Sequence, residues 1–176
     1  MRPHRVTWLA VLVVLLGARE ALTSESHDEI SLEDVVRRST VIAVVEPATP
    51  PTKESKVPIG GKHPPYERTQ HRLVVKEVLS NRAGTKLPVG KTIEVDVGDY
   101  DTRLTVHRRY YLEGVRKSPI YSYYRPAPVV DGGASSPQEI VFLVRSGDGW
   151  EFTASGARER LERRAAIEAL LAKTGD

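Results

Sequence analysis

Residues 110–125, in a stretch from residue 101 that is rich in basic residues, combine arginine and tyrosine in a pattern that suits the recognition of another molecule. Tyrosine supplies a large contact area at little cost in side-chain entropy, and arginine adds directional hydrogen bonds. We therefore predict that this segment carries the binding surface of the protein, for a protein partner or a component of the cell envelope. The side chains that we assign to this surface are Tyr121, Tyr123, Tyr124, Arg125 and Arg109.

The same residues allow two other interpretations. On a small β-barrel, tyrosine and arginine could stack on the bases of a nucleic acid or on the sugars of an oligosaccharide. Alternatively, Tyr110 and Tyr111 are half-buried residues of a strand, where tyrosine is also favoured, and residues 122–125 pack only against their own loop.

Asp96, Asp99 and Asp101 form an acidic cluster that could bind a hard cation such as calcium. Their spacing does not match the calcium-binding loop of EF-hand proteins. Aspartate is also common in turns, where its side chain forms hydrogen bonds with the nearby backbone. We therefore predict a turn at this position, without a metal or a cofactor.

The sequence offers little for catalysis. It contains no HExxH, GxSxG or glycine-rich phosphate-binding motif, and no histidine has a second ligand at metal-binding spacing. The absence of cysteine excludes disulfides, thiolate zinc sites, a cysteine nucleophile and a bacterial lipid anchor. We predict that the protein is not an enzyme, and a secreted hydrolase is the third alternative after the two kinds of binding domain.

Residues 1–23 have the features of a secretory signal peptide. Arg2 and Arg5 precede an apolar run over residues 6–16. Such a run is shorter than the roughly 20 residues that a membrane span needs, but it suits the apolar region of a signal peptide. A buried core helix is the alternative. The position at the N-terminus favours export, so we predict a secreted or periplasmic protein without an integral membrane segment after cleavage.

The charge balance changes when this leader is removed. The whole chain has a formal net charge of +3. Residues 24–176 retain 23 basic and 22 acidic residues, a net charge of +1. A nearly neutral chain gives little support to nucleic acid as the partner.

The elements that must position the binding residues are mostly strands. Ile93, Val95 and Val97 alternate with polar residues, which predicts a strand with one buried face, and residues 72–75 form its partner. Further strands are predicted over residues 41–45, 102–107, 110–115 and 139–145, the last of which enters a hairpin turn at residues 146–149.

Two helices and two long loops complete the prediction. Ser31 should cap a short N-terminal helix, and Ser155 should cap a C-terminal helix. Prolines and glycine pairs predict long loops over residues 47–69 and 118–138. Together these elements predict a mainly β protein, in which residues 24–176 form a single OB-like small barrel, closed or partly open, with a short N-terminal helix and a C-terminal helix.

Residues 31–46 (SLEDVVRRSTVIAVVE), 72–97 (RLVVKEVLSNRAGTKLPVGKTIEVDV) and 139–152 (EIVFLVRSGDGWEF) resemble the opening helix and strand, the strand pair and the closing hairpin of a class of exported bacterial domains. These domains are similar to the netrin-like fold of the tissue inhibitors of metalloproteinases, a five-stranded OB-type barrel with flanking helices. Those inhibitors act through an N-terminal cysteine, which this chain lacks, so the resemblance implies a fold and transfers no inhibitory residue.

Overall fold

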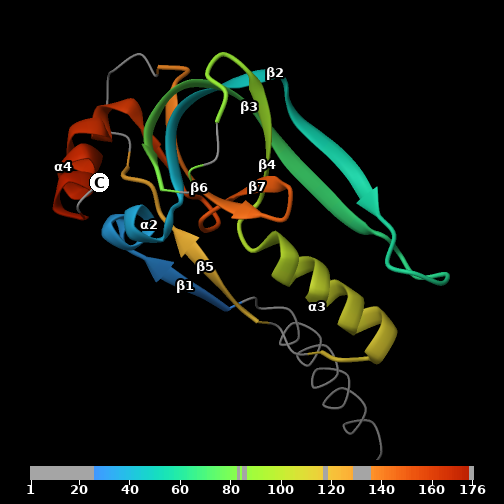
Figure 1. The fold of residues 1–176 in the computed structure, drawn as a ribbon. Helices are drawn as coiled ribbons and strands as arrows, with labels where there is room; N and C mark the ends of the chain where they lie inside the picture. Colours follow the sequence, from blue (N-terminus) through green and yellow to red (C-terminus); the bar gives the residue numbers. More distant parts are fainter. Residues whose placement is uncertain (1–25, 83, 85–86, 117–118, 129–135, 175–176) are drawn as a thin grey trace, which may run out of the picture.

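The computed structural model describes residues 26–82, 84, 87–116, 119–128 and 136–174, which fold into a mainly β structure (Figure 1). This confirms the predicted fold class at that level. The predicted leader, residues 1–23, lies outside the described residues. The strands are β1 (Ser26–Ile30), β2 (Val41–Val57), β3 (Tyr66–Asn81), β4 (Thr92–Asp96), β5 (Ile120–Tyr124), β6 (Glu139–Ser146), β7 (Gly149–Phe152) and β8 (Arg158–Arg160). The helices are α2 (Leu32–Arg38), α3 (Tyr100–Glu113), the 3-10 turn Leu161–Arg163 and α4 (Arg164–Thr174).

Five strands are hydrogen-bonded in a circuit. β2 pairs antiparallel with β3, β3 antiparallel with β4, β4 parallel with β7, β7 antiparallel with β6, and β6 antiparallel with β2. β8 adds to the edge of β6, and β1 and β5 form a separate parallel pair. The predicted strand pair of residues 72–75 and 93–97 is confirmed as part of β3 and β4, and the predicted hairpin at residues 146–149 joins β6 to β7.

The main core is formed by this circuit together with α2 and α4, whose buried residues belong to the same cluster. All five residues of β2 from Val41 to Val45 are buried, and β6 contributes four successive buried residues, Ile140 to Leu143. Trp150 and Phe152 are buried on one face of β7, as their spacing predicts. A run of buried residues on β6 is expected because both of its edges are paired and its faces are covered.

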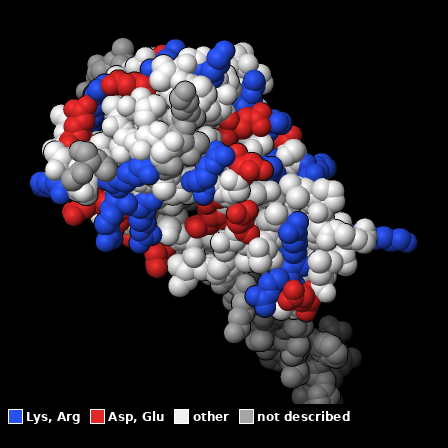
Figure 2. Space-filling view, viewed as in Figure 1, with Lys and Arg blue, Asp and Glu red and all other residues white. Residues whose placement is uncertain are grey.

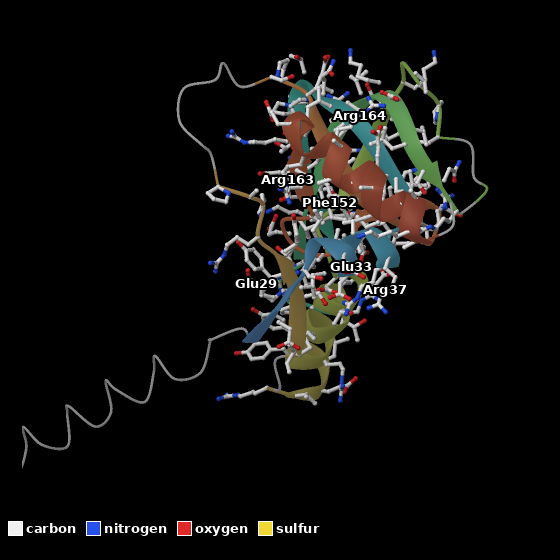
Figure 3. All side chains as sticks on the ribbon, turned by 90° about the vertical axis from the view of Figure 1, so that its left-hand side faces the viewer. Glu29, Glu33, Arg37, Phe152, Arg163 and Arg164 are labelled. Carbon is white, nitrogen blue, oxygen red and sulfur yellow. The ribbon has the colours of Figure 1, made fainter. Side chains whose placement is uncertain are left out.

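The helices α2 and α4 pack against each other on one side of the sheet (Figure 1). The Ser31 hydroxyl accepts a hydrogen bond from the Asp34 amide, which confirms the predicted cap of α2. The prediction that Ser155 caps the last helix is wrong, because the chain first forms β8 and the 3-10 turn. On the face of α4 that Figure 3 shows, Arg164 lies 2.7 Å from Glu77 of β3.

The predicted loop over residues 47–69 is wrong, since β2 and β3 continue into a long two-stranded ribbon that leaves only residues 58–65 between them. The prolines are tolerated because they lie at an irregularity, where the register shifts between Pro47 and Thr52. Arg72 donates hydrogen bonds to the carbonyls of Thr49 and Pro50, at the point where the backbone ladder is interrupted.

The predicted strands over residues 102–107 and 110–115 are also wrong, because this segment is the helix α3. Tyr100, Leu104, His107 and Tyr111 are spaced by four, three and four residues, which places them on one face of a helix. Leu104 and Val106 are two residues apart, a spacing that also fits a strand, but both lie in this helix.

Within the part of the chain that the structure describes, no helix is long and apolar enough to span a membrane.

The predicted loop over residues 118–138 is only partly a loop. Residues 120–124 form β5, which pairs with β1 and is joined to residue 155 through the Tyr124 amide and the Ser155 carbonyl, 2.8 Å apart. The part of this loop at residues 129–135 lies outside the described residues. Tyr121, Tyr123 and Tyr124 lie within this paired strand, so the packing of β5 decides which of their side chains remain exposed to a partner.

Candidate functional site

The helix α3 and the outer part of the β2–β3 ribbon form a unit with a small core of its own. Ile59, Tyr100 and Leu104 are buried in this second cluster, separate from the main core, and Tyr66 and Tyr111 pack against it. Figure 1 shows α3 lying beneath the outer half of the ribbon. We call residues 52–68 and 100–116 the ribbon–α3 lobe.

Aromatic rings join the two parts of the lobe. The ring of Tyr66 lies edge-on to Tyr100 at 5.9 Å and to His107 at 5.4 Å. His107 lies 4.8 Å from the Tyr111 ring, which in turn lies 4.9 Å from Tyr110. Ring pairs at these separations stabilise packing beyond the area that they bury. They fix the position of α3, and thereby of its C-terminal end.

The C-terminal end of α3 carries exposed apolar side chains. Among the described residues, four large hydrophobic side chains are exposed: Val89 (60%), Tyr110 (47%), Leu112 (52%) and Ile120 (61%). Three of these four lie within residues 110–120. The helix ends there because Gly114 adopts a left-handed conformation, with φ of 68°, that a side chain would disfavour. We call Arg109, Tyr110, Leu112, Arg116 and Ile120 the α3-end surface. Tyr110 and Leu112 are two positions apart on the helix and point to different sides of it, and Ile120 begins β5, so this surface lies around the end of α3 and not on a single helix face.

The structure separates the predicted binding residues into two groups. Tyr121 and Tyr124 are only 3% and 4% exposed, so the prediction that they form an exposed contact surface is wrong. Tyr121 packs under the guanidinium of Arg103, 4.1 Å from the ring centroid. Tyrosine patterns alone do not distinguish an anchoring ring from a contact ring, because the side chain suits both.

The other predicted residues remain accessible. Tyr123 is half-buried, and Arg125 is exposed with its guanidinium 3.6 Å from Glu29 of β1. Arg109 is exposed on α3 and lies 3.1 Å from Glu113. Arg109 therefore belongs to the α3-end surface, whereas Tyr123 and Arg125 lie on β5 and at its end. The sequence signal missed Leu112 and Ile120, which are exposed although apolar.

Tyr124 is held by a buried carboxylate. Its hydroxyl donates a short hydrogen bond to Glu159, which is only 2% exposed and also accepts from the Ala127 amide at 3.2 Å. Burial raises the pKa of the Tyr124 hydroxyl, and the hydrogen bond to Glu159 and its charge add to the effect. Tyr124 therefore stays a neutral donor that satisfies the buried carboxylate.

We expect Tyr124→Phe to lower the free energy of unfolding by about 1–3 kcal/mol, because a buried carboxylate loses a hydrogen-bond donor. Tyr110→Phe removes the same hydroxyl from an exposed position and should change stability by less than about 0.5 kcal/mol. Urea denaturation of both variants makes the comparison. Equal stability of the two would contradict this role of Tyr124.

The three aspartates of the predicted acidic cluster have separate partners. Asp99 accepts a hydrogen bond from the Ser122 amide at 3.0 Å, and Asp101 accepts one from the Ser146 hydroxyl at 2.9 Å. Asp96 is bound by Arg68. Among the described residues, no group of three or more histidine and acidic side chains could hold a metal ion.

Asp96 and Arg68 connect the ribbon–α3 lobe to the sheet. Arg68 donates two hydrogen bonds to Asp96, of 2.7 and 2.6 Å, and its guanidinium lies 4.6 Å from the centroid of the Tyr100 ring. The Asp96 side chain is only 4% exposed. Such a bidentate pair fixes geometry as well as energy. It ties the end of β4 to the ribbon and to the start of α3.

Glu151 lies near the same junction. It accepts a hydrogen bond from the Asp99 amide at 3.1 Å. Burial raises the pKa of the Glu151 carboxyl, and the charges of Asp101 and Asp99 raise it further. A carboxyl with a raised pKa is a candidate acid in a catalytic site. Here its hydrogen bond holds the loop that leads into α3, so the geometry indicates a structural role.

The described histidines contact rings and backbone. His107 lies 3.2 Å from the Pro64 carbonyl oxygen, and His63 lies 6.1 Å from the Tyr111 ring. His71 packs edge-on against Phe152 at 5.5 Å, and burial, with the charge of Arg158, lowers its pKa. None of these contacts places a histidine beside a serine or threonine hydroxyl, the arrangement in which a histidine activates such a nucleophile.

A hollow of about 510 Å³ lies on the other side of the molecule, between the start of β6 and β8. Three prolines, Pro47, Pro126 and Pro137, form its apolar part. Arg158 of its wall lies 3.3 Å from Glu139, and Glu159 is already satisfied by Tyr124. Because both signs of charge line the hollow, it indicates no particular ligand.

No protein-family model matches the chain, and neither the curated proteins nor the solved structures include a match. The geometry of the chain itself therefore has to carry any statement about function.

Proposed function

We propose that the protein is an exported, non-enzymatic binding domain that contacts a protein partner through the α3-end surface. The observation that carries the proposal is the exposure of Tyr110, Leu112 and Ile120 within residues 110–120. Apart from Val89, the other large apolar side chains that the structure describes are buried or half-buried. The centres of protein interfaces are rich in aromatic, aliphatic and arginine side chains of this kind. Because α3 is fixed by ring contacts, little conformational entropy is lost on binding.

An OB-like barrel is the framework that we propose for this surface. The circuit β2–β3–β4–β7–β6 supports it, with five strands that pair in a ring and with α3 inserted between β4 and β6. In this assignment β3 and β4 are the second and third barrel strands, and the β2–β3 ribbon is the first loop. The netrin-like resemblance is a proposal about this framework and adds nothing about the partner.

The oligosaccharide or nucleic-acid alternative has less support. OB-folds bind such ligands on the face of the second and third strands, with aromatic rings that stack on bases or sugars. The corresponding outward residues of β3 and β4 in the described structure, Arg72, Val74, Thr92 and Glu94, include no aromatic ring. Glu94 is bound by Lys53 at 2.8 Å, so that face offers little free charge.

The test is a triple variant with a matched control. Tyr110→Ser combined with Leu112→Ser and Ile120→Ser should weaken partner binding by about thirtyfold or more, since hot-spot side chains each contribute about 2 kcal/mol. Val89→Ser removes an equally exposed apolar side chain from the turn before β4 and should leave binding unchanged. A protein captured from envelope extract with wild-type chain is identified, purified and titrated against each variant.

Urea denaturation serves as the control for folding. All four side chains are exposed, so the unfolding free energy of each variant should stay within about 1 kcal/mol of wild type. Unchanged affinity in a folded triple variant would contradict the proposal, as would an equal loss in Val89→Ser.

A further inference from the structure

Charge is distributed unevenly between the ribbon–α3 lobe and the remainder of the chain. The lobe contains eight basic and four acidic residues, whereas the rest of residues 24–176 contains 15 basic and 18 acidic residues. The near-neutral total therefore combines a basic lobe with an acidic remainder. Two of the basic residues of the lobe, Lys53 and Arg68, are paired with Glu94 and Asp96 of the remainder, so the separation is smaller than the count alone suggests. A separation of this kind steers association with a partner of opposite charge.

Part of the basic charge in the lobe is compensated locally. Lys56 lies 3.3 Å from Glu67, and Arg109 lies 3.1 Å from Glu113. Both pairs are exposed, so water and salt screen them, and each contributes little to stability. Such pairs can rearrange when a partner offers another carboxylate.

Three basic side chains of the lobe have no acidic partner among the described residues: Lys62, Arg108 and Arg116. All three are exposed. Lys62 lies in the turn of the ribbon, Arg108 on α3 and Arg116 just beyond its C-terminal cap. Figure 2 shows Lys and Arg side chains at the far end of the ribbon and over α3. These charges lie on the same lobe as Tyr110 and Leu112 of the α3-end surface.

We infer that the partner of the α3-end surface is an acidic polypeptide segment that carries aromatic or aliphatic anchors among Asp and Glu residues. This inference rests on the proposed function. Apolar side chains of such a segment would pack on Tyr110 and Leu112, and its carboxylates would pair with Lys62, Arg108 and Arg116. Arginine pairs well with carboxylates because its planar guanidinium can donate two parallel hydrogen bonds.

Selection from a display library of random 16-residue peptides tests the inference while the natural partner is still unidentified. The purified wild-type protein should enrich peptides of negative net charge that contain aromatic or aliphatic residues. The variant K62E/R108E/R116E should lose this enrichment and favour neutral or basic peptides. An individual enriched acidic peptide should bind that variant at least tenfold more weakly, and its affinity for wild type should fall as salt is raised.

A matched variant controls for total charge. R38E/R163E/K173E makes the same change in net charge on the α2 and α4 side of the molecule, where Figure 3 labels Arg163. It should enrich the same acidic peptides as wild type. Loss of enrichment in this control as well as in K62E/R108E/R116E would overturn the inference, because net charge alone would then explain it.

Three further outcomes are decisive. The wild-type protein could enrich peptides that show no charge bias, while the variant with serine at Tyr110, Leu112 and Ile120 fails to enrich them. That result would overturn the inference of an acidic partner and would leave the proposed function intact. If neither K62E/R108E/R116E nor the serine variant changes which peptides are enriched, both the inference and the proposed function are overturned. Heparin that binds the lobe and does not depend on Tyr110 or Leu112 would overturn the inference in favour of a polysaccharide polyanion.

Discussion

Phe142→Ala is expected to lower the free energy of unfolding by about 3–5 kcal/mol, the range for removal of a large buried ring. Phe142 is fully buried in the middle of β6 and lies opposite Ile42 of β2. Its ring lies 6.2 Å from that of Tyr124, so it also packs the separate β1–β5 pair onto the sheet. Several elements would therefore lose contacts at once.

Urea denaturation, followed by both tryptophan fluorescence and circular dichroism, measures this loss. Phe142→Leu keeps most of the volume and should cost less than about 1.5 kcal/mol, which makes it the matched control. A cost below about 1.5 kcal/mol for the alanine variant would show that β6 is not the centre of the core. The strand circuit would then lose its main energetic support.

The second large effect is expected at the junction between the sheet and the ribbon–α3 lobe. Arg68→Met should lower the unfolding free energy by about 2–4 kcal/mol, because it leaves the buried carboxylate of Asp96 without its charged partner and with only the long hydrogen bond of 3.4 Å from the Gln70 amide. Water reaches Arg68, whose side chain is 29% exposed, so we place the effect at the lower part of the usual range. Faster hydrogen exchange of the α3 amides should accompany it, since Arg68 also packs on Tyr100.

Lys53→Met is the matched control for this effect. It breaks the ion pair between Lys53 and Glu94, whose side chains are 51% and 39% exposed. The unfolding free energy should therefore fall by less than about 1 kcal/mol. Combining Arg68→Met with Asp96→Asn should recover part of the lost stability, because the uncompensated charge is then removed. Similar costs for Arg68→Met and Lys53→Met would contradict the assignment of Arg68 as the connection.

The sequence predicts those strands whose apolar residues alternate with polar ones or form a short continuous run. The alternation at Ile93 and Val95, the apolar run of Val41 to Val45 and the Trp150 and Phe152 spacing all correspond to buried positions. These patterns are informative because the side chains of a strand alternate strictly between two faces. The short helix after Ser31 is predicted for a different reason, because its N-terminal cap is an interaction between residues that are close in sequence.

The ribbon and α3 could not be predicted in this way. The prolines at positions 47, 50 and 51 indicate a loop, yet a register shift and the guanidinium of Arg72 let the strand pass through them. The helix α3 packs on the rings of Tyr66 and His63 of the ribbon, which is distant in sequence. Its own residues contain β-branched and aromatic side chains that a local pattern assigns to a strand.

The candidate site shows the same division. The sequence favours a binding surface in this stretch because arginine and tyrosine gather there. It cannot tell which tyrosines face the solvent, since Tyr121 and Tyr124 are buried by contacts with Arg103 and Glu159 that depend on the folded chain. Leu112 and Ile120 carry no polar signal and become candidates only through their exposure in the structure.

Site-specific photo-cross-linking tests the central claim most directly. A photoreactive amino acid is placed singly at Tyr110, Leu112, Ile120 or Val89, all of them exposed, and the protein is irradiated in envelope extract. Positions 110, 112 and 120 should yield adducts with one and the same protein, and position 89 should yield none. Adducts only from position 89, or no shared adduct from the other three, would contradict a binding surface at the end of α3.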